Sequence, residues 1–215
     1  DGREFFLDCR TQVVHDPQGN PIALCGIATD ITDRKRADDA LRRRLDYEQA
    51  AADCMGILLE SSGLDDRLQP ILDILLKAVN CSRVYLFQNE QDPQAGVCMT
   101  QTHEAVSEGI VSQIDNPVLQ HLPYRDSAPS LLSVLQDRQP YARMVAEIED
   151  PERDILESQG ILSILILPIH CGAEFWGFIG FDDCSSVRRW QEEDANLLQV
   201  VADGIGVAVQ RTRAE

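Results

Sequence analysis

Residues 161–184, ILSILILPIHCGAEFWGFIGFDDC, form the most apolar stretch of the chain. Two runs of strand length, 161–169 and 175–181, are separated by a short polar break that contains Gly172. A glycine-containing connection of this length is typical of a β-hairpin. The first run is apolar at successive positions, which predicts a central strand covered on both faces. A buried helix is the alternative, and Pro168 together with three glycines argues against it.

Outside this hairpin, the apolar periodicity predicts further strands and helices. The strands are expected at residues 3–14, 21–31, 82–89, 97–106 and 139–145. The helices are expected at 33–62, 64–79, 130–137, 150–159 and 191–213. A long segment without periodicity, 107–129, separates two of these elements, and such segments are usually functional or mobile.

Two of the expected helices carry a heptad stripe. In the helix at 33–62 the stripe consists of Leu41, Leu45, Glu48, Ala52, Met55 and Leu59, and in the last helix it consists of Leu198, Val201, Ile205, Ala208 and Thr212. An apolar stripe needs a partner, which is either the sheet of the same chain or a second copy. The stripes therefore predict a homodimer through parallel helices, with packing on the sheet as the alternative.

Composition narrows the class of protein. The 215 residues are 44% apolar, allow one or two domains, and contain no apolar run of transmembrane length. The net charge of −17 lies entirely in residues 46–215, because residues 1–45 hold equal numbers of acidic and basic side chains. Such a surface repels nucleic acid and anionic membranes. Seven singly spaced cysteines predict reduced thiols in a cytoplasmic protein, and the missing initiator Met predicts a fragment of a longer one.

The end of the chain resembles a GAF domain, a small-molecule-sensing and dimerising module of signalling proteins. The resemblance rests on Leu-Pro-Ile at 167–169, on FWGFIGFDDC at 175–184, and on an Arg and a Trp before an amphipathic helix. It extends over residues 46–213. It implies an α+β fold of three layers, in which a central antiparallel sheet carries the first and last helices on one face. The ligand pocket would lie on the other face, under the long loop and the middle helices.

The start of the chain resembles the end of a PAS domain. The resemblance rests on residues 30–36, DITDRKR, where the last strand of a PAS domain runs into a signalling helix. It implies that 1–33 is an N-terminal hairpin from an incomplete PAS domain, that 34–62 is a linker helix, and that 46–213 is the GAF domain. Linker helices of this kind pair in a parallel dimer through their N-terminal part and pack on the GAF sheet through their C-terminal part.

The GAF resemblance implies a set of pocket residues: Tyr85, Phe87, His103, Tyr124, Met144, Phe178 and Asp182. Ordinary core packing is the alternative for the aromatic residues and Met144. Asp182 stands where bilin-binding relatives carry a chromophore-facing His. Its alternative is a turn or helix-entry carboxylate beside Asp183.

The identity of a ligand is left unknown by the sequence. Bilin-binding relatives attach their chromophore through a Cys-His pair about seventeen residues before the strand's Pro, and this count from Pro168 reaches Pro151 and Glu152. Because Pro151 and Glu152 stand where those relatives have Cys and His, a covalently attached bilin is not expected. The cyclic-nucleotide signature of the family is not found either. No zinc spacing, phosphate loop or nucleophile elbow occurs, so an enzyme is not expected.

These patterns predict a regulatory sensor fragment of a multidomain bacterial signalling protein, such as a two-component system. The GAF domain would bind a small molecule or dimerise, and its first and last helices would relay the signal to a downstream kinase or cyclase. A ligand-free dimerisation spacer is the alternative. A thiol-based redox sensor, or an enzyme like the GAF-fold methionine sulfoxide reductases, is a third.

Overall fold

The computed structural model describes residues 5–60 and 63–214. The chain divides into two compact units, Asp1–Leu45 and Asp46–Glu215. The expected strand at 3–14 and the expected helix at 33–62 each extend over residues outside the described ranges. Among the described residues, no helix combines the length and the apolar character that crossing a membrane requires.

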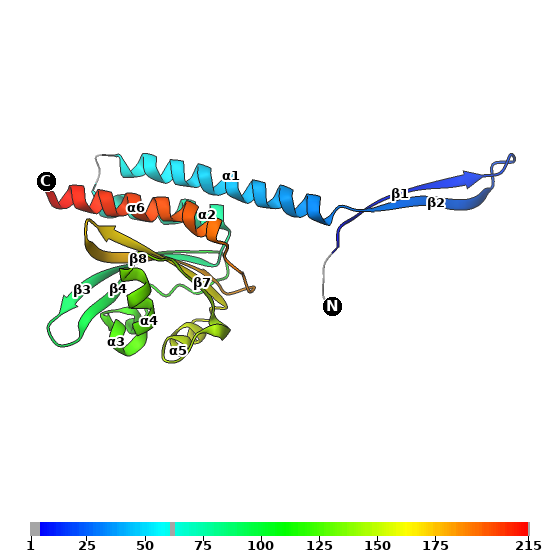
Figure 1. Ribbon diagram of the computed structural model, residues 1–215. Coiled ribbons are helices and arrows are strands. Elements are labelled where there is room, and N and C mark those ends of the chain that lie inside the picture. Colours follow the sequence, from blue (N-terminus) through cyan, green and yellow to red (C-terminus); the bar gives the residue numbers. More distant parts are fainter. Residues whose placement is uncertain (1–4, 61–62, 215) are drawn as a thin grey trace. The chain divides into compact units, whose positions relative to one another are not determined.

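The first unit contains an antiparallel hairpin, as the sequence predicts (Figure 1). Strands β1 (Leu7–His15) and β2 (Pro21–Asp30) pair from Leu7 and Asp30 at one end to His15 and Pro21 at the other. Asp16 closes the turn because its Oδ1 atom accepts hydrogen bonds from the amides of Gln18 and Asn20, at 2.9 and 2.8 Å. Every residue of both strands is exposed, including the apolar side chains of Leu7, Val13, Val14, Ile22, Leu24 and Ile27.

Helix α1 (Thr32–Leu58) crosses the boundary between the two units. In the second unit, its buried residues are Tyr47, Ala50, Cys54 and Leu58. The heptad residues Leu41, Leu45 and Leu59 are instead 59%, 56% and 73% exposed. The packed face of the helix therefore overlaps the heptad stripe only in part, since Met55 of the stripe packs against the same cluster while these three leucines do not.

The second unit is built on a six-stranded sheet with the order β5-β4-β3-β8-β7-β6. Its strands are β3 (Arg83–Asp92), β4 (Gly96–Val106), β5 (Leu122–Pro123), β6 (Tyr141–Met144), β7 (Ser163–Cys171) and β8 (Glu174–Asp183). All neighbours pair antiparallel. The hairpin predicted from residues 161–184 is confirmed as β7 and β8, which occupy interior positions of the sheet.

Helices cover both faces of this sheet, so the predicted three-layer α+β architecture is confirmed (Figure 1). One face packs against α1, α2 (Leu64–Val79) and α6 (Glu192–Ala214) through one apolar cluster. The other face packs against α3 (Tyr124–Ser127), α4 (Pro129–Gln136) and α5 (Glu152–Ser158) through a second cluster. Residues of β7 alternate between the two, with Leu165 and Leu167 in the first cluster and Ile164 and Ile166 in the second.

The heptad stripe of α6 packs on the sheet. Leu198, Val201, Ile205 and Ala208 are buried in the same cluster as the strands, whereas Thr212 is exposed. For this helix, the sheet of the same chain is the partner that the stripe requires.

The segment expected to be irregular, 107–129, contains short elements. They are a 3₁₀ turn η1 (Pro117–Leu119), strand β5 and helix α3, and a further 3₁₀ turn, η2 (Val145–Glu147), follows β6. Strand β5 adds to the sheet edge by pairing with β4, with Leu122 opposite Met99. The segment is therefore held over the second face of the sheet.

Candidate ligand pocket

A cavity of about 60 Å³ lies between the sheet and the elements on its second face. The apolar part of the lining includes Phe87, Met99, Leu119, Leu122, Ala128, Leu131, Ile155, Leu156, Ile161, Ile164, Ile166 and Phe178. The polar part consists of Arg83, Tyr85, Gln101, Glu104, Gln113, Ser127, Glu152, Gln159 and Asp182.

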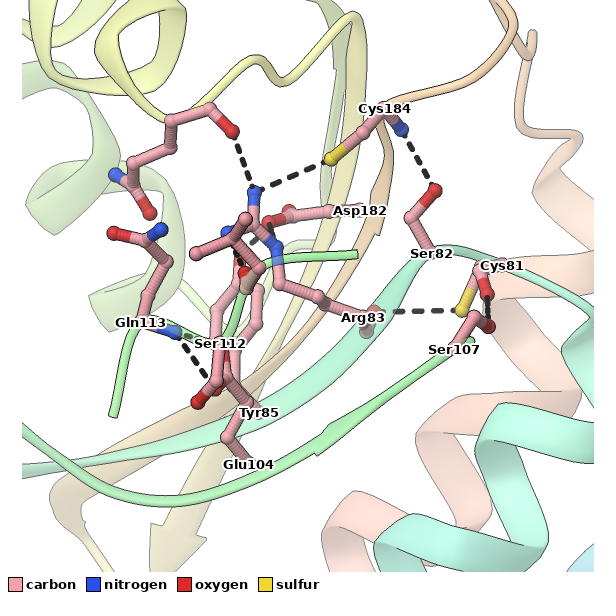
Figure 2. A network of polar contacts seen from close by, with 12 residues as sticks. Cys81, Ser82, Arg83, Tyr85, Glu104, Ser107, Ser112, Gln113, Asp182 and Cys184 are labelled. Carbon is pink, nitrogen blue, oxygen red and sulfur yellow. Dashed lines mark hydrogen bonds and ion pairs between the residues drawn. The ribbon is translucent and has the colours of Figure 1, made fainter. Parts of the chain in front are cut away.

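Arg83 joins four segments at one end of the cavity (Figure 2). It begins β3 directly opposite Asp182 of β8, is 1% exposed, and holds its Nε atom 3.4 Å from the Asp182 Oδ2 atom. Its Nη2 atom donates to the Gln159 carbonyl at 3.0 Å and to the Cys184 Sγ atom at 3.2 Å, and its Nη1 atom donates to the Val111 carbonyl at 3.4 Å. Both terminal nitrogens of the guanidinium group therefore donate to protein acceptors, while its Nε atom faces Asp182 without a hydrogen bond.

Asp182 is held between Arg83 and Tyr85. The Tyr85 hydroxyl donates to the Asp182 Oδ1 atom at 2.8 Å. Burial raises the pKa of Asp182 to about 7, although Arg83 and the Tyr85 hydrogen bond act in the opposite direction. Burial also raises the pKa of Tyr85, so the tyrosine remains a donor.

Gly180 makes this arrangement sterically possible. It lies opposite Tyr85 in the ladder between β3 and β8. A Cβ atom at position 180 would lie 2.2 Å from the Tyr85 ring, well inside van der Waals contact. The ring therefore crosses the strand where only glycine leaves room for it.

Glu104 fastens the loop that covers one side of the cavity (Figure 2). Its carboxylate accepts hydrogen bonds from the amides of Gln113 and Ile114, at 2.8 and 3.2 Å, and from the Ser112 hydroxyl. Charge-assisted hydrogen bonds of this kind are stronger than neutral ones. Together with the Arg83 bond to Val111, they hold residues 111–114 against β3 and β4.

Glu152 and Gln101 bring unused acceptors to the cavity. Glu152 begins α5, is 6% exposed, and accepts a hydrogen bond from the Ser130 hydroxyl through its Oε2 atom at 3.4 Å. Burial raises the pKa of Glu152, against the effect of hydrogen bonds from Tyr141 and Ser130. Within the described part of the chain, its Oε1 atom and the Oε1 atom of Gln101 are buried without a hydrogen-bond partner.

Four of the seven candidate pocket residues line the cavity: Tyr85, Phe87, Phe178 and Asp182. The rings of Phe87 and Phe178 stack with their centroids 4.8 Å apart. Tyr124 is outside the lining but is buried in the same apolar cluster, and it donates to the Asn89 Oδ1 atom at 2.9 Å. Met144 is half-buried at the end of β6, opposite Ser163, and this register places it on the same face as Leu165, away from the cavity.

His103 lies on the other face of the sheet. The register between β3 and β4 shifts between Leu86 and Phe87, so that His103 pairs with Leu86 while Gln101 pairs with Phe87. A bulge of this kind moves all later side chains of the strand to the opposite face. Burial lowers the pKa of His103, and Asp65 in the first turn of α2 opposes that shift.

The polar residues of the lining other than Tyr85 and Asp182 were not among the sequence candidates. For Glu152 a signal existed, because the count from Pro168 places it where bilin-binding relatives hold the His of their attachment pair. Arg83 follows from strand alternation, since it lies two residues before Tyr85. Glu104 and Gln101 depend on the bulge, which the sequence did not reveal.

Four thiols of the second unit show the opposite of activation. Burial raises the pKa of Cys54, Cys81, Cys98 and Cys184, and reactive cysteines need a lowered pKa. In the described residues, no group of three or more His, Cys, Asp and Glu side chains has the geometry of a metal site.

Comparisons with known proteins show which family the chain resembles. The chain is 38% identical over 200 residues to the methanogenesis regulatory histidine kinase FilI of Methanothrix harundinacea (strain 6Ac). The match covers 93% of this chain, which spans 22% of the relative's length.

Among solved structures, the chain resembles the phycocyanobilin-bound GAF domain of a cyanobacterial phytochrome, with a TM-score of 0.65 and 18% identity over 78% of this chain and 96% of that one. It also resembles the GAF3 domain of Slr1393 from Synechocystis sp. PCC6803, with a TM-score of 0.59 and 21% identity over 71% and 96% of the two chains. At these identities the likeness is one of fold. The GAF domain model itself matches residues 63–209, which is more than half of the sequence, and the chain therefore belongs to the GAF domain family.

Proposed function

We propose that this chain is the sensory and relay part of a cytoplasmic multidomain histidine kinase, in which the GAF domain responds to a small molecule in the cavity. The observation that carries the proposal is the buried group of Arg83, Asp182 and Tyr85 at the cavity. Buried charges are expensive to maintain, and they concentrate where a protein binds or reacts. The similarity to a regulatory histidine kinase supports the choice of output.

The relay would run through the sheet. Strands β3, β7 and β8 contribute residues both to the cavity and to the opposite cluster with α1, α2 and α6. Because protein interiors are close-packed, a change of volume on one face is transmitted to the other. Occupation of the cavity would therefore shift the first and last helices of the GAF domain relative to each other.

The N-terminal unit would belong to a PAS domain, and the chain would pair with a second copy of itself. The hairpin would be the end of a PAS domain, since its exposed apolar residues Leu24 and Ile27 need a cover that two strands cannot supply. The exposed heptad residues Leu41, Leu45 and Leu59 would pair with the same helix of a second copy. The site proposal keeps the seven candidate residues, with His103 acting from the helix-covered face.

A second function, a dimerisation spacer without a ligand, is favoured by one observation. The cavity of about 60 Å³ is far below the roughly 300–1,000 Å³ of pockets for drug-sized ligands. A domain filled by its own side chains would transmit changes from the N-terminal unit without sensing anything itself. A thiol-based sensor or enzyme has less support, because burial raises the pKa of the thiol nearest to Arg83, that of Cys184.

Native mass spectrometry of the protein purified from its own host distinguishes these functions. A denatured sample measured in parallel gives the covalent mass. For a sensor, we expect a dimer with additional non-covalent mass that is lost on denaturation. A dimer of bare protein mass supports the spacer, and a monomer at high concentration contradicts the relay in either form.

A further inference from the structure

We propose that the GAF cavity is a site for a short-chain alkylammonium ion, bound by the carboxylate of Glu152 and the side-chain carbonyl of Gln101. This inference rests on the proposed sensing function and names the chemical class of its ligand. It follows from the hydrogen-bonding capacity, charge and size of the cavity, which are independent observations.

The lining has two buried acceptors without a hydrogen bond, and its one donor in the same state, the Arg83 Nε atom, faces the Asp182 carboxylate. The Oε1 atoms of Glu152 and Gln101 are buried and have no partner among the residues that the structure describes. Both side chains are more than nine-tenths buried, with 6% and 4% exposure. A buried acceptor without a donor is costly, so an occupant that donates hydrogen bonds to both atoms is favoured.

The cation of the lining is not available to an anionic ligand. The two terminal nitrogens of Arg83 donate to protein acceptors, and its Nε atom, which makes no hydrogen bond, faces the Asp182 Oδ2 atom at 3.4 Å. An incoming carboxylate or phosphate would have to displace Asp182 or a backbone carbonyl. The geometry therefore selects against an anion.

The charge of the lining favours a cation. It contains three carboxylates, those of Glu104, Glu152 and Asp182, and one guanidinium group. Glu104 is satisfied by backbone amides and Asp182 by Arg83 and Tyr85, whereas the hydrogen bonds to Glu152 come from neutral hydroxyls and Arg143 acts on it only through its charge. A bound cation would balance this carboxylate, and the net charge of −17 on the GAF unit attracts cations from solution.

The size of the cavity limits the ligand to a few non-hydrogen atoms. A volume of about 60 Å³ accommodates an ammonium group with a short alkyl chain. The rest of the lining, which includes Phe87, Ile164, Ile166 and Phe178, offers apolar contact to such a chain. A ligand of three non-hydrogen atoms would bind no more tightly than about a millimolar dissociation constant, given the affinity ceiling per atom.

The test is a titration of the whole 215-residue protein, labelled at isoleucine methyl groups, with ethylammonium chloride. Ile164 and Ile166 report on the cavity, and Ile71 and Ile205, which lie in the cluster on the other face, report on the rest of the domain. Sodium chloride, sodium acetate and ethanol serve as probes of ionic strength, of negative charge and of an uncharged donor. We expect saturable shifts at Ile164 and Ile166 with ethylammonium alone.

Two variants connect the binding to the proposed residues. Glu152→Gln should weaken ethylammonium binding at least tenfold, whereas Glu157→Gln, an exposed substitution on the same helix, should leave it unchanged. Gln101→Met should weaken binding several-fold if the Glu152 variant does not fold. Unchanged shifts at Ile71 and Ile205 show that each variant keeps the fold.

Three results would overturn the proposal. The first is the absence of any saturable shift at tens of millimolar ethylammonium, which would mean that ordered water alone fills the cavity. The second is equal binding of ethylammonium by the Glu152→Gln variant. The third is an equal response of Ile164 and Ile166 to acetate. A different result would contradict the sensing function itself. Retained mass of another chemical class in native mass spectrometry would keep the sensor and remove the alkylammonium, whereas a bare dimer that ignores ethylammonium would remove both.

Discussion

The contact between Tyr85 and Gly180 is a tight steric requirement of the site, because the aromatic ring occupies the space of a side chain at position 180. Gly180→Ala should push the ring away and break the hydrogen bond from Tyr85 to Asp182. We expect a loss of about 1–3 kcal/mol in the free energy of unfolding, the usual range for overpacking a core. Denaturant unfolding followed by circular dichroism measures it.

The matched control is Gly56→Ala in α1. No heavy atom lies within 4 Å of a Cβ placed there, and the position is inside a helix. Alanine should therefore raise the free energy of unfolding, by up to about 1 kcal/mol. If both substitutions stabilise the protein, the steric account of Gly180 is wrong.

Asp182 should titrate near neutrality. Burial raises its pKa to about 7 against the opposing effects of Arg83 and Tyr85, and the carboxylates of Glu104 and Asp183 raise it further. Carbon-13 NMR of the side-chain carboxyl groups should show this midpoint. Asp16 is an internal control, since hydrogen bonds from Asn20 lower its pKa below the ordinary value.

The same shift has a consequence for stability. The folded-state pKa of Asp182 lies above the unfolded value of 3.8, so the folded protein binds the proton more tightly. The stabilisation linked to this group is complete below pH 3.8 and is lost as the pH rises through about 7. A carboxyl midpoint near the ordinary value for aspartate would contradict both statements.

At the scale of single residues, strand alternation predicted the site only where the pairing register is regular. Tyr85, Phe87 and Phe178 follow the alternation and reach the cavity, whereas a bulge in β4 sends His103 to the opposite face. Trp176 behaves in the same way, because the register shifts beside it and it joins the helix-covered cluster. A bulge depends on pairing between distant strands, which local sequence does not specify.

At the scale of elements, the loop over the cavity depends on one carboxylate. Glu104→Gln should weaken the bonds to the amides of Gln113 and Ile114, which are charge-assisted. We expect hydrogen exchange at these two amides to accelerate about tenfold, equivalent to about 1.4 kcal/mol. Exchange measured by NMR on the native protein tests it.

The control for the loop is Glu108→Gln. This glutamate is exposed and lies in the same segment. The Glu108→Gln substitution should leave hydrogen exchange at the amides of Gln113 and Ile114 unchanged. Equal acceleration in both variants would show that general loss of charge, rather than the Glu104 contacts, loosens the loop.

Periodicity predicted the longer helices and strands because each repeats its pattern several times. It missed β5 and α3, which have two and four residues and are shorter than one full period. It also left the partner of each heptad stripe open. The observed packing buries most of the stripe of α6, and it leaves Leu41 and Leu45 of α1, and Leu59 directly after it, exposed.

At the scale of the whole molecule, the exposed stripe of α1 makes a prediction about assembly. Leu45 is 56% exposed and is the second residue of the stripe. If a second copy covers it, Leu45→Asp should shift the protein from dimer to monomer, because it places two like charges in an apolar seam. Sedimentation equilibrium over a range of concentrations measures the dissociation constant.

Ala40→Asp is the control for assembly. It introduces the same charge at an exposed position of α1 outside the stripe, and it should leave the dissociation constant within a few-fold of the parent value. Wild-type protein that stays monomeric at the highest concentration would exclude the dimer altogether.

The alternation of β7 between two clusters has a consequence for how this domain can evolve. Ile164 and Ile166 contact the cavity, whereas Leu165, Leu167 and Ile169 contact the helices. If the cavity binds a ligand and the helices carry the signal, as proposed, neighbouring residues of β7 have separate tasks. Substitution of the even-numbered positions alone would then change the stimulus, and the odd-numbered positions would keep the contacts that carry the response.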